Sequence, residues 1–222
     1  MSSSQQRQAQ ARHLNKVIDR VLLEPTEKHI QEVVQSSRPA MTAAMAERVR
    51  RRATLLARRE RLSRKIFLDR RDTLIRLIYA GRAPADCYCA WTDGSVYSAA
   101  EKCIAGLGGI LLDPGGTMIS EFSLRKEERD GFTAEIAAIE TVLGKARAHG
   151  VTRLRVHTDC KALVQLWFRR REDARLAEMR RLAGEFKLLQ LQNVPRQHNH
   201  SAHQLARQAM VRPTVEYPGC SV

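Results

Sequence analysis

The sequence lacks any uninterrupted apolar run of the roughly 18 to 20 residues that a membrane-spanning helix needs. Its polar start, MSSSQQRQAQARH, also lacks the apolar stretch of a secretory signal peptide. Aromatic residues make up only 5% of the chain, and no glycine occurs before Gly81. With 43% hydrophobic residues in 222 there is still enough apolar material for a core, which excludes wholesale disorder. We therefore expect a folded cytoplasmic protein with no membrane segment.

The cysteines are scattered and odd in number, and no CxxC pair occurs. This pattern excludes a disulfide framework and a zinc ribbon. The simplest interpretation is a set of buried free thiols. They are Cys87, Cys89, Cys103, Cys160 and Cys220.

The charge is strongly one-sided, because 38 Lys and Arg face 24 Asp and Glu and leave a formal net charge of +14. A surface this basic predicts a polyanionic partner. Residues 1–85 hold 19 basic and 8 acidic residues, whereas residues 86–222 hold 19 and 16. The first part is also rich in Ala, Leu, Arg, Glu and Gln, which favours helices, and the stretch GRAPAD forms a boundary. We predict a basic helical region at 1–80, a second domain at 86–212 and a C-terminal tail at 213–222 without assigned structure.

The densest positive charge lies between Arg48 and Arg71, where eleven basic residues accompany two acidic ones. Leu55, Leu62 and Ile66 recur among them at helical intervals, which predicts a helix with one apolar side. That side could pack on the second domain or on a second copy of the chain, as in a homodimer. The arginines could also bind phosphates through charge-assisted hydrogen bonds, and one helix could do both.

The second part alternates strand-like and helical patterns in the order βββαβαβα, with an additional helical stretch before the last strand. This order predicts an α/β sandwich in which parallel and antiparallel pairings are mixed. The first three strands form a hairpin meander with a tight turn at Pro114-Gly115-Gly116. The predicted strands are 87–93, 104–113, 117–125, 153–159 and 188–194, and the predicted helical segments are 133–150, 161–171, 176–186 and 201–210.

Three acidic residues fall where these elements meet. Asp93 closes the first predicted strand, Glu135 lies in the first turn of the following helix, and Asp159 closes the fourth strand. Three carboxylates that converged there would repel one another unless divalent cations neutralised them. An all-oxygen set with few protein ligands favours Mg²⁺ or Mn²⁺. Each acid alone also has a simpler interpretation, as a turn residue, a charge at a helix start or an N-cap.

At these residues the sequence resembles the ribonuclease H family, type 1. The matching segments are TDGS at 92–95, TAEIAAI at 133–139, HTDCKALV at 157–164 and VPRQHNHSAHQLARQA at 194–209, which together span most of residues 87–210. The resemblance implies a ribonuclease H-like mixed five-stranded sheet flanked by helices, here preceded by the basic helical region. It also implies an endonuclease that hydrolyses the RNA strand of RNA/DNA hybrids with two Mg²⁺ or Mn²⁺ ions.

The family's catalytic and metal-binding set corresponds by position to Asp93, Glu135, Asp159 and His203. His203 stands where the family usually has an aspartate, so the affinity for the second ion should fall and its pH dependence change.

A histidine-rich triplet, His198-Asn199-His200, precedes this fourth position. A zinc site there would leave the three distant carboxylates unexplained. We expect His198 or His200 on a mobile loop, where it would shuttle protons or face solvent.

Substrate contacts are expected beside the acids and on the basic helix. The family commonly has amide side chains just before its glutamate, whereas Phe132 stands there and could stack or only pack. The chain between Asp159 and His203 is too short for an extended basic handle, so we expect the arginine-rich helix to replace it, with Arg169, Arg170 and Arg171 assisting. The predicted substrate-binding residues are Gly94, Ser95, Phe132, Lys161, His198, Asn199, Arg58 and Arg59.

Two alternatives remain beside hybrid hydrolysis. One is a protein with this fold that binds nucleic acid without cutting it, because its fourth ligand has changed. The other is a nuclease of this fold that acts on double-stranded RNA or on a structured DNA intermediate.

Overall fold

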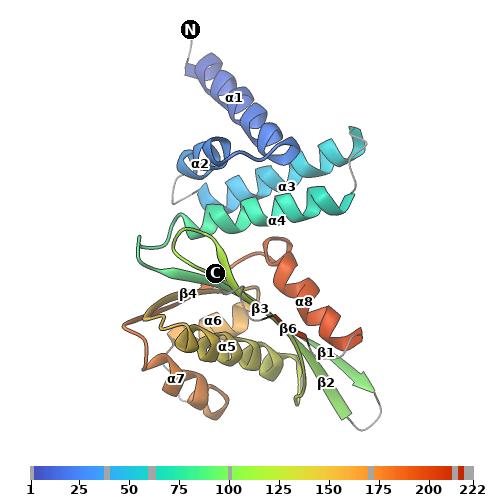
Figure 1. The fold of residues 1–222 in the computed structure, drawn as a ribbon, viewed down its shortest axis with the longest axis vertical. Helices are drawn as coiled ribbons and strands as arrows, with labels where there is room; N and C mark the ends of the chain where they lie inside the picture. Colours follow the sequence, from blue (N-terminus) through green and yellow to red (C-terminus); the bar gives the residue numbers. More distant parts are fainter. Residues whose placement is uncertain are drawn as a thin grey trace. The chain divides into compact units, whose positions relative to one another are not determined.

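The computed structural model describes residues 3–37, 41–59, 64–99, 102–169, 173–211 and 215–217. The chain divides into two compact units, Met1–Arg82 and Ala83–Val222, of which the first is helical and the second is built on a sheet (Figure 1). Within the described ranges, no helix combines the length and apolarity that crossing a membrane requires.

The first unit confirms the predicted helical region. Its helices are α1 (Ser3–Leu23), α2 (Glu27–Ser36), α3 (Thr42–Arg59) and α4 (Arg64–Ala80). Thr26 caps α2, because its side chain accepts a hydrogen bond from the backbone N–H of His29. Apolar side chains from all four helices are buried together, among them Ile18, Leu22, Val33, Val49, Phe67, Leu74 and Ile78.

The arginine-rich segment does not form the single amphipathic helix that was predicted. It is divided between α3 and α4, and Leu62 lies between them, outside the described residues. Leu55 and Ile66 are 47% and 39% exposed, so they do not form a buried stripe. The spacing of the large residues Leu55, Leu62 and Ile66 therefore predicted the wrong buried side, because the buried side of α3 includes the small residue Ala53. That side consists of Met45, Val49, Ala53 and Leu56, at intervals of three and four residues.

The second unit contains the predicted mixed sheet of five strands, and the tail adds a short sixth strand at its edge. The strand order is β5-β4-β1-β2-β3-β6, with β1, β2 and β3 antiparallel, β6 antiparallel to β3, and β4 parallel to both β1 and β5. Gly116, at φ 89°, makes the turn between β2 and β3. The strands are β1 (Tyr88–Ala99), β2 (Lys102–Leu112), β3 (Met118–Glu127), β4 (Arg153–Thr158), β5 (Leu188–Asn193) and β6 (Val215–Tyr217).

Helices cover both faces of this sheet. The helices are α5 (Gly131–Ala148), α6 (Lys161–Phe168), α7 (Ala177–Ala183) and α8 (His200–Val211). On one face, Leu107 and Val156 of the sheet share a core with Ile139 of α5. On the other face Gly108 lies under α8, where a Cβ would come within 2.3 Å of the Ala202 carbonyl oxygen. Because Leu107 and Gly108 are consecutive in β2, α5 and α8 lie on opposite faces.

Candidate active site

Asp93 lies within a strand and not at its end, which corrects the sequence-based expectation. β1 continues to Ala99 because it pairs with β2 from Cys89 to Ala99, whereas its parallel pairing with β4 ends at Trp91. Extending that parallel register places Asp93 opposite Asp159, the first residue after β4. The two carboxylates therefore meet where β4 ends, although β1 runs on past them.

Asp93 and Gly94 are consecutive residues of β1, so they lie on opposite faces of the sheet. Asp93 is opposite Gly108 in β2, so its side chain lies on the face that α8 covers. Gly94 faces α5, and a Cβ on it would lie 2.4 Å from the carbonyl carbon of Ala134 and 2.5 Å from the backbone nitrogen of Glu135. The absence of a side chain at Gly94 therefore lets α5 approach the strand closely enough for Glu135 to reach Asp93. The structure thus gives Gly94, predicted to bind substrate, a role in packing.

Glu135 lies in the second turn of α5, not in the first as predicted. The helix begins earlier, at Gly131, because Asp130 and Thr133 form a capping box. Thr158 donates a hydrogen bond from Oγ1 to the Glu135 carboxylate at 3.2 Å. A charge at the helix start therefore does not explain Glu135.

Asp159 is held by an amide from the start of α8. Asn199 is 1% exposed, and its Nδ2 donates both to Asp159 Oδ1 at 2.8 Å and to the Thr92 carbonyl oxygen at 2.9 Å. This one side chain thus ties together β1, the end of β4 and the start of α8. Asn199 was predicted to bind substrate, whereas the structure shows it buried and orienting a carboxylate.

The three carboxylates form one cluster, because Asp93, Glu135 and Asp159 each contribute an oxygen and these atoms lie within 4.8 Å of one another. Asp93 is only 2% exposed. Burial raises its pKa to about 6, and the Asp159 carboxylate adds to the rise, while the hydrogen bond from His203 opposes it. Burial, followed by the charges of Asp93 and Asp159, also raises the pKa of Glu135 well above its usual value.

A divalent cation fits this cluster. Its donors are all carboxylate oxygens, and a bound positive charge would offset both the cost of their burial and their mutual repulsion, which together raise the pKa values of Asp93 and Glu135. Hard oxygen ligands of this kind suit Mg²⁺ and Mn²⁺.

His203, the residue at the predicted fourth position, lies beside the cluster. Its Nδ1 is 3.0 Å from Asp93 Oδ2, and the Arg196 guanidinium lies 3.3 Å from its Nε2. His203 is not among the residues whose ligand atoms converge within 4.8 Å, so it flanks the carboxylates. Arg196 also lies 3.9 Å from Asp159.

The other predicted contact residues of the second unit have different positions. Ser95 is half-buried in β1, and Lys161 is exposed at the first position of α6. Phe132 is partly buried at the start of α5, and the Arg175 guanidinium lies over its ring at 4.5 Å. His198 is only 5% exposed, in the short 3₁₀ turn Arg196–His198, so of the two histidines that were expected to shuttle protons or face solvent, this one does not face solvent.

The predicted contact residues of the first unit are Arg58 and Arg59, at the end of α3. Arg58 is exposed and lines a hollow of about 410 Å³ together with Phe67 of α4. The side chain of Arg59 lies outside the described residues, as do Arg170 and Arg171 of the predicted assisting group.

Sequence reasoning did not identify Arg196 or Thr158. Thr158 bonds directly to Glu135 of the cluster, and Arg196 contacts His203, which in turn lies beside Asp93. Thr158 directly precedes Asp159 in the segment HTD, and this adjacency was the only available signal. Arg196 contacts His203 from the preceding 3₁₀ turn, a geometry that spacing alone does not reveal.

Comparisons with known proteins agree with this geometry. A model of the family described as reverse transcriptase-like matches residues 92–209. No curated protein matches the chain significantly.

Solved structures of ribonucleases H share the fold of the second unit. RNase H1 from the halophilic archaeon Halobacterium salinarum is 21% identical, with a TM-score of 0.51 over 56% of this chain and 98% of its own. The N-terminal RNase H domain of a Mycobacterium tuberculosis protein is 24% identical, with a TM-score of 0.50 over 56% and 98%. LC11-RNase H1, isolated from compost, is 20% identical, with a TM-score of 0.51 over 57% and 96%. The resemblance found in the sequence is thereby confirmed: the chain carries a ribonuclease H-like domain and belongs to the reverse transcriptase-like family.

Proposed function

We propose that this protein is a metal-dependent endonuclease that hydrolyses the RNA strand of RNA/DNA hybrids. Residues 86–212 would form the catalytic domain, and residues 1–80 would contribute to holding the substrate. The observation that carries the proposal is the convergence of Asp93, Glu135 and Asp159 within 4.8 Å on a ribonuclease H-like sheet.

The proposed catalytic residues have distinct tasks. Asp93, the most buried of the acids, would hold two Mg²⁺ or Mn²⁺ ions together with Glu135 and Asp159. When bound, such a pair of ions activates water and stabilises the leaving oxygen of a phosphodiester. Asn199 and Thr158 would keep two of the carboxylates oriented.

His203 would assist the acidic cluster from the fourth position of the catalytic set. Its contact with Asp93 limits the freedom of that carboxylate, and the nearby Arg196 brings positive charge to the side where a phosphate would lie. Lys161 and Ser95 remain proposed contacts of the nucleic acid.

The test is a cleavage assay on end-labelled RNA/DNA hybrid, double-stranded RNA and double-stranded DNA, each with Mg²⁺, Mn²⁺ or chelator. We expect metal-dependent fragments from the hybrid's RNA strand only. If double-stranded RNA or double-stranded DNA were cut and the hybrid were not, the proposed substrate would be wrong. Salt-sensitive binding without cutting under any metal would instead identify a non-cleaving nucleic-acid-binding protein.

Metal affinity should depend on pH, because protons and cations compete for the same carboxylates. The pKa of Asp93 is raised to about 6, and that of Glu135 is raised well above its usual value. As pH falls through about 6, Asp93 takes up a proton and the cation must displace it, so affinity should fall about tenfold per pH unit per displaced proton. Calorimetric titration with Mn²⁺ across this range would measure the effect. A constant affinity would show that these carboxylates do not bind the ion.

Replacing Asn199 by alanine should weaken both the site and the fold. The Asp159 carboxylate and the Thr92 carbonyl would lose their buried donor, which should lower the free energy of unfolding by about 1–3 kcal/mol. Cleavage should fall about 10- to 100-fold, as for other residues that orient metal ligands. Asn193→Ala is the matched control, because that exposed amide donates only to the Thr158 carbonyl. Equal losses in the two variants would contradict an orienting role for Asn199.

A further inference from the structure

Most of the described arginines in the segment Arg48–Arg71 are already bonded within the first unit, some of them inside one helix and others between helices. Of the eight basic side chains described there, five are bonded within the unit, which leaves few of them free for phosphates. These bonds join Arg50 and Arg51 to Glu47, Arg52 to Asp19, Arg70 to the carbonyl oxygens of Leu22 and Leu23, and Arg71 to Asp72.

Helix α1 carries a different set of basic residues, Arg12, Lys16 and Arg20, which we call the α1 ridge. All three side chains are exposed, and none forms an ion pair with any described residue. The one acidic residue of α1, Asp19, is already bonded to Arg52. The positive charge of the α1 ridge is therefore not neutralised by the part of the chain that the structure describes.

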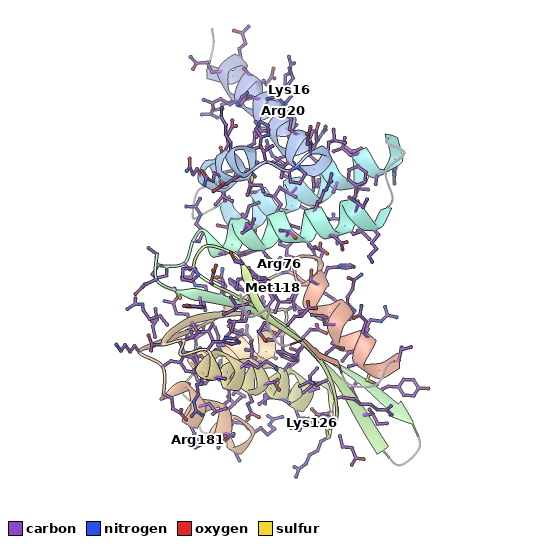
Figure 2. The ribbon with its side chains drawn as sticks, in the orientation of Figure 1. Lys16, Arg20, Arg76, Met118, Lys126 and Arg181 are labelled. Carbon is purple, nitrogen blue, oxygen red and sulfur yellow. The ribbon has the colours of Figure 1, made fainter. Side chains whose placement is uncertain are left out.

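The spacing of the α1 ridge suits a row of negative charges. Its residues are four positions apart, so they stack on one side of the helix, and Lys16 and Arg20 lie about one turn apart (Figure 2). Each step rises about 6 Å along the axis, which allows successive side chains to contact phosphates of one strand. The side chains of residues 4–10 are exposed as well, so this part of α1 is open to a partner.

The apolar side of α1 is already buried inside the first unit. Val17, Ile18, Val21 and Leu22 are at most 2% exposed and belong to the core of the first unit. A helix that lies on a membrane must bury its apolar side in lipid, which α1 cannot do without unfolding this unit. A polyanion that needs only charge and hydrogen bonds fits the exposed side better, and nucleic acid is such a polyanion.

We infer that the α1 ridge binds the phosphate backbone of duplex nucleic acid, in addition to the contacts that the catalytic domain makes with its substrate. This inference rests on the proposed function. It assigns the task to Arg12, Lys16 and Arg20 and not to the arginine-rich segment, for which the sequence had predicted it. Because phosphate contacts do not depend on sequence, the α1 ridge contributes affinity and no base preference.

The test compares two triple variants of the full chain, both in an Asp93→Asn background so that the duplex stays intact. One carries R12Q, K16Q and R20Q. The control carries R51Q, R147Q and R181Q, which remove the same charge from exposed arginines paired with Glu47, Glu185 and Glu178. Glutamine is a good helix former, so circular dichroism should show equal helix content in both.

Binding is measured by fluorescence anisotropy with a labelled RNA/DNA hybrid over a series of salt concentrations. The α1 ridge variant should bind the hybrid on the order of tenfold more weakly at low salt. The slope of log affinity against log salt is negative, and its magnitude should decrease by about 2.7, the value for three phosphate contacts. The control should keep the slope of the parent. Equal slopes for both triple variants would overturn the inference. It would also be overturned if the α1 ridge variant lost binding to phosphatidylserine vesicles but still bound the hybrid like the parent. A failure of the proposed function would appear separately, as absence of metal-dependent cleavage by the unaltered chain.

Discussion

Replacing Asp93 by asparagine is expected to abolish cleavage of the hybrid and at the same time to stabilise the metal-free protein. An asparagine at this position would keep the shape of the side chain but remove a buried charge that lies in contact with two other carboxylates. Activity should fall by at least on the order of a thousandfold, because a neutral amide would hold the divalent cations far more weakly, and it is the cations that stabilise the charge of the transition state. Binding of the hybrid should remain, since phosphate contacts elsewhere are unaffected.

The gain in stability follows from the raised pKa of Asp93. In the unfolded chain an aspartate loses its proton near pH 3.8, whereas in the folded protein Asp93 keeps it up to about pH 6. Between these values the folded state holds more protons on Asp93, so the contribution of Asp93 to the free energy of unfolding falls as pH rises and levels off above about 6. Above that range the ionised Asp93 costs on the order of 3 kcal/mol, the energy of a pKa rise from 3.8 to about 6, and asparagine would remove this cost.

Thermal or urea unfolding in chelator, at several pH values, would measure this difference between the parent and Asp93→Asn. The gap should be small near pH 4 and widen toward pH 7. Asp86→Asn is the matched control, because Asp86 is an exposed carboxylate paired with Arg153 at 3.1 Å. It should retain full activity and change stability by less than about 1 kcal/mol at any pH. Retained turnover in Asp93→Asn, or a stability gap that does not grow with pH, would contradict the proposed site.

The sequence predicted the five-stranded core of the second unit well, because its strands β1 to β5 and its main helices carry local signals, whereas β6 in the tail was not predicted. The glycine pair after Pro114 specified the β2–β3 turn, and the apolar spacing of Ile136, Ile139 and Val142 identified the buried face of α5. The three acids could be found because each belongs to a short local motif, TDGS, TAEIAAI or HTDCKALV.

Long-range pairing was harder to predict. Asp93 was assigned to a strand end because Gly94-Ser95 looks like a turn, but pairing with β2 extends the strand to Ala99. Similarly, His198 looked like a solvent-exposed loop residue, and only the packing of the turn before α8 buries it. Such features depend on partners distant in the sequence, which local patterns do not show.

The other large effect is expected at Gly94, where one added methyl group should damage both fold and site. In Gly94→Ala the new Cβ would lie 2.4 Å from the Ala134 carbonyl carbon and 2.5 Å from the Glu135 nitrogen. Both are backbone atoms of α5 and cannot rotate away, so the helix must move off the strand. Overpacking of this kind costs about 1–3 kcal/mol, and sometimes more.

The same movement should displace Glu135 from Asp93, because the close approach at Gly94 is what brings α5 to the cluster. A shift of about 1 Å in a positioned group can cost on the order of a hundredfold in rate, so cleavage should fall by that amount even at temperatures where Gly94→Ala stays folded. Mn²⁺ titration should show weaker binding in parallel, as expected if one ligand has moved.

Gly144→Ala, on α5 itself, is the matched control. A Cβ there would meet nothing within 4 Å, and the position is exposed. Alanine favours the helix over glycine, so this variant should be about 0.5–1 kcal/mol more stable and fully active. The same chemical change should thus have opposite effects at the two glycines: it is harmful where β1 touches α5 and favourable where α5 faces solvent. If both variants were equally stable and active, the close contact between β1 and α5 would not be what positions Glu135.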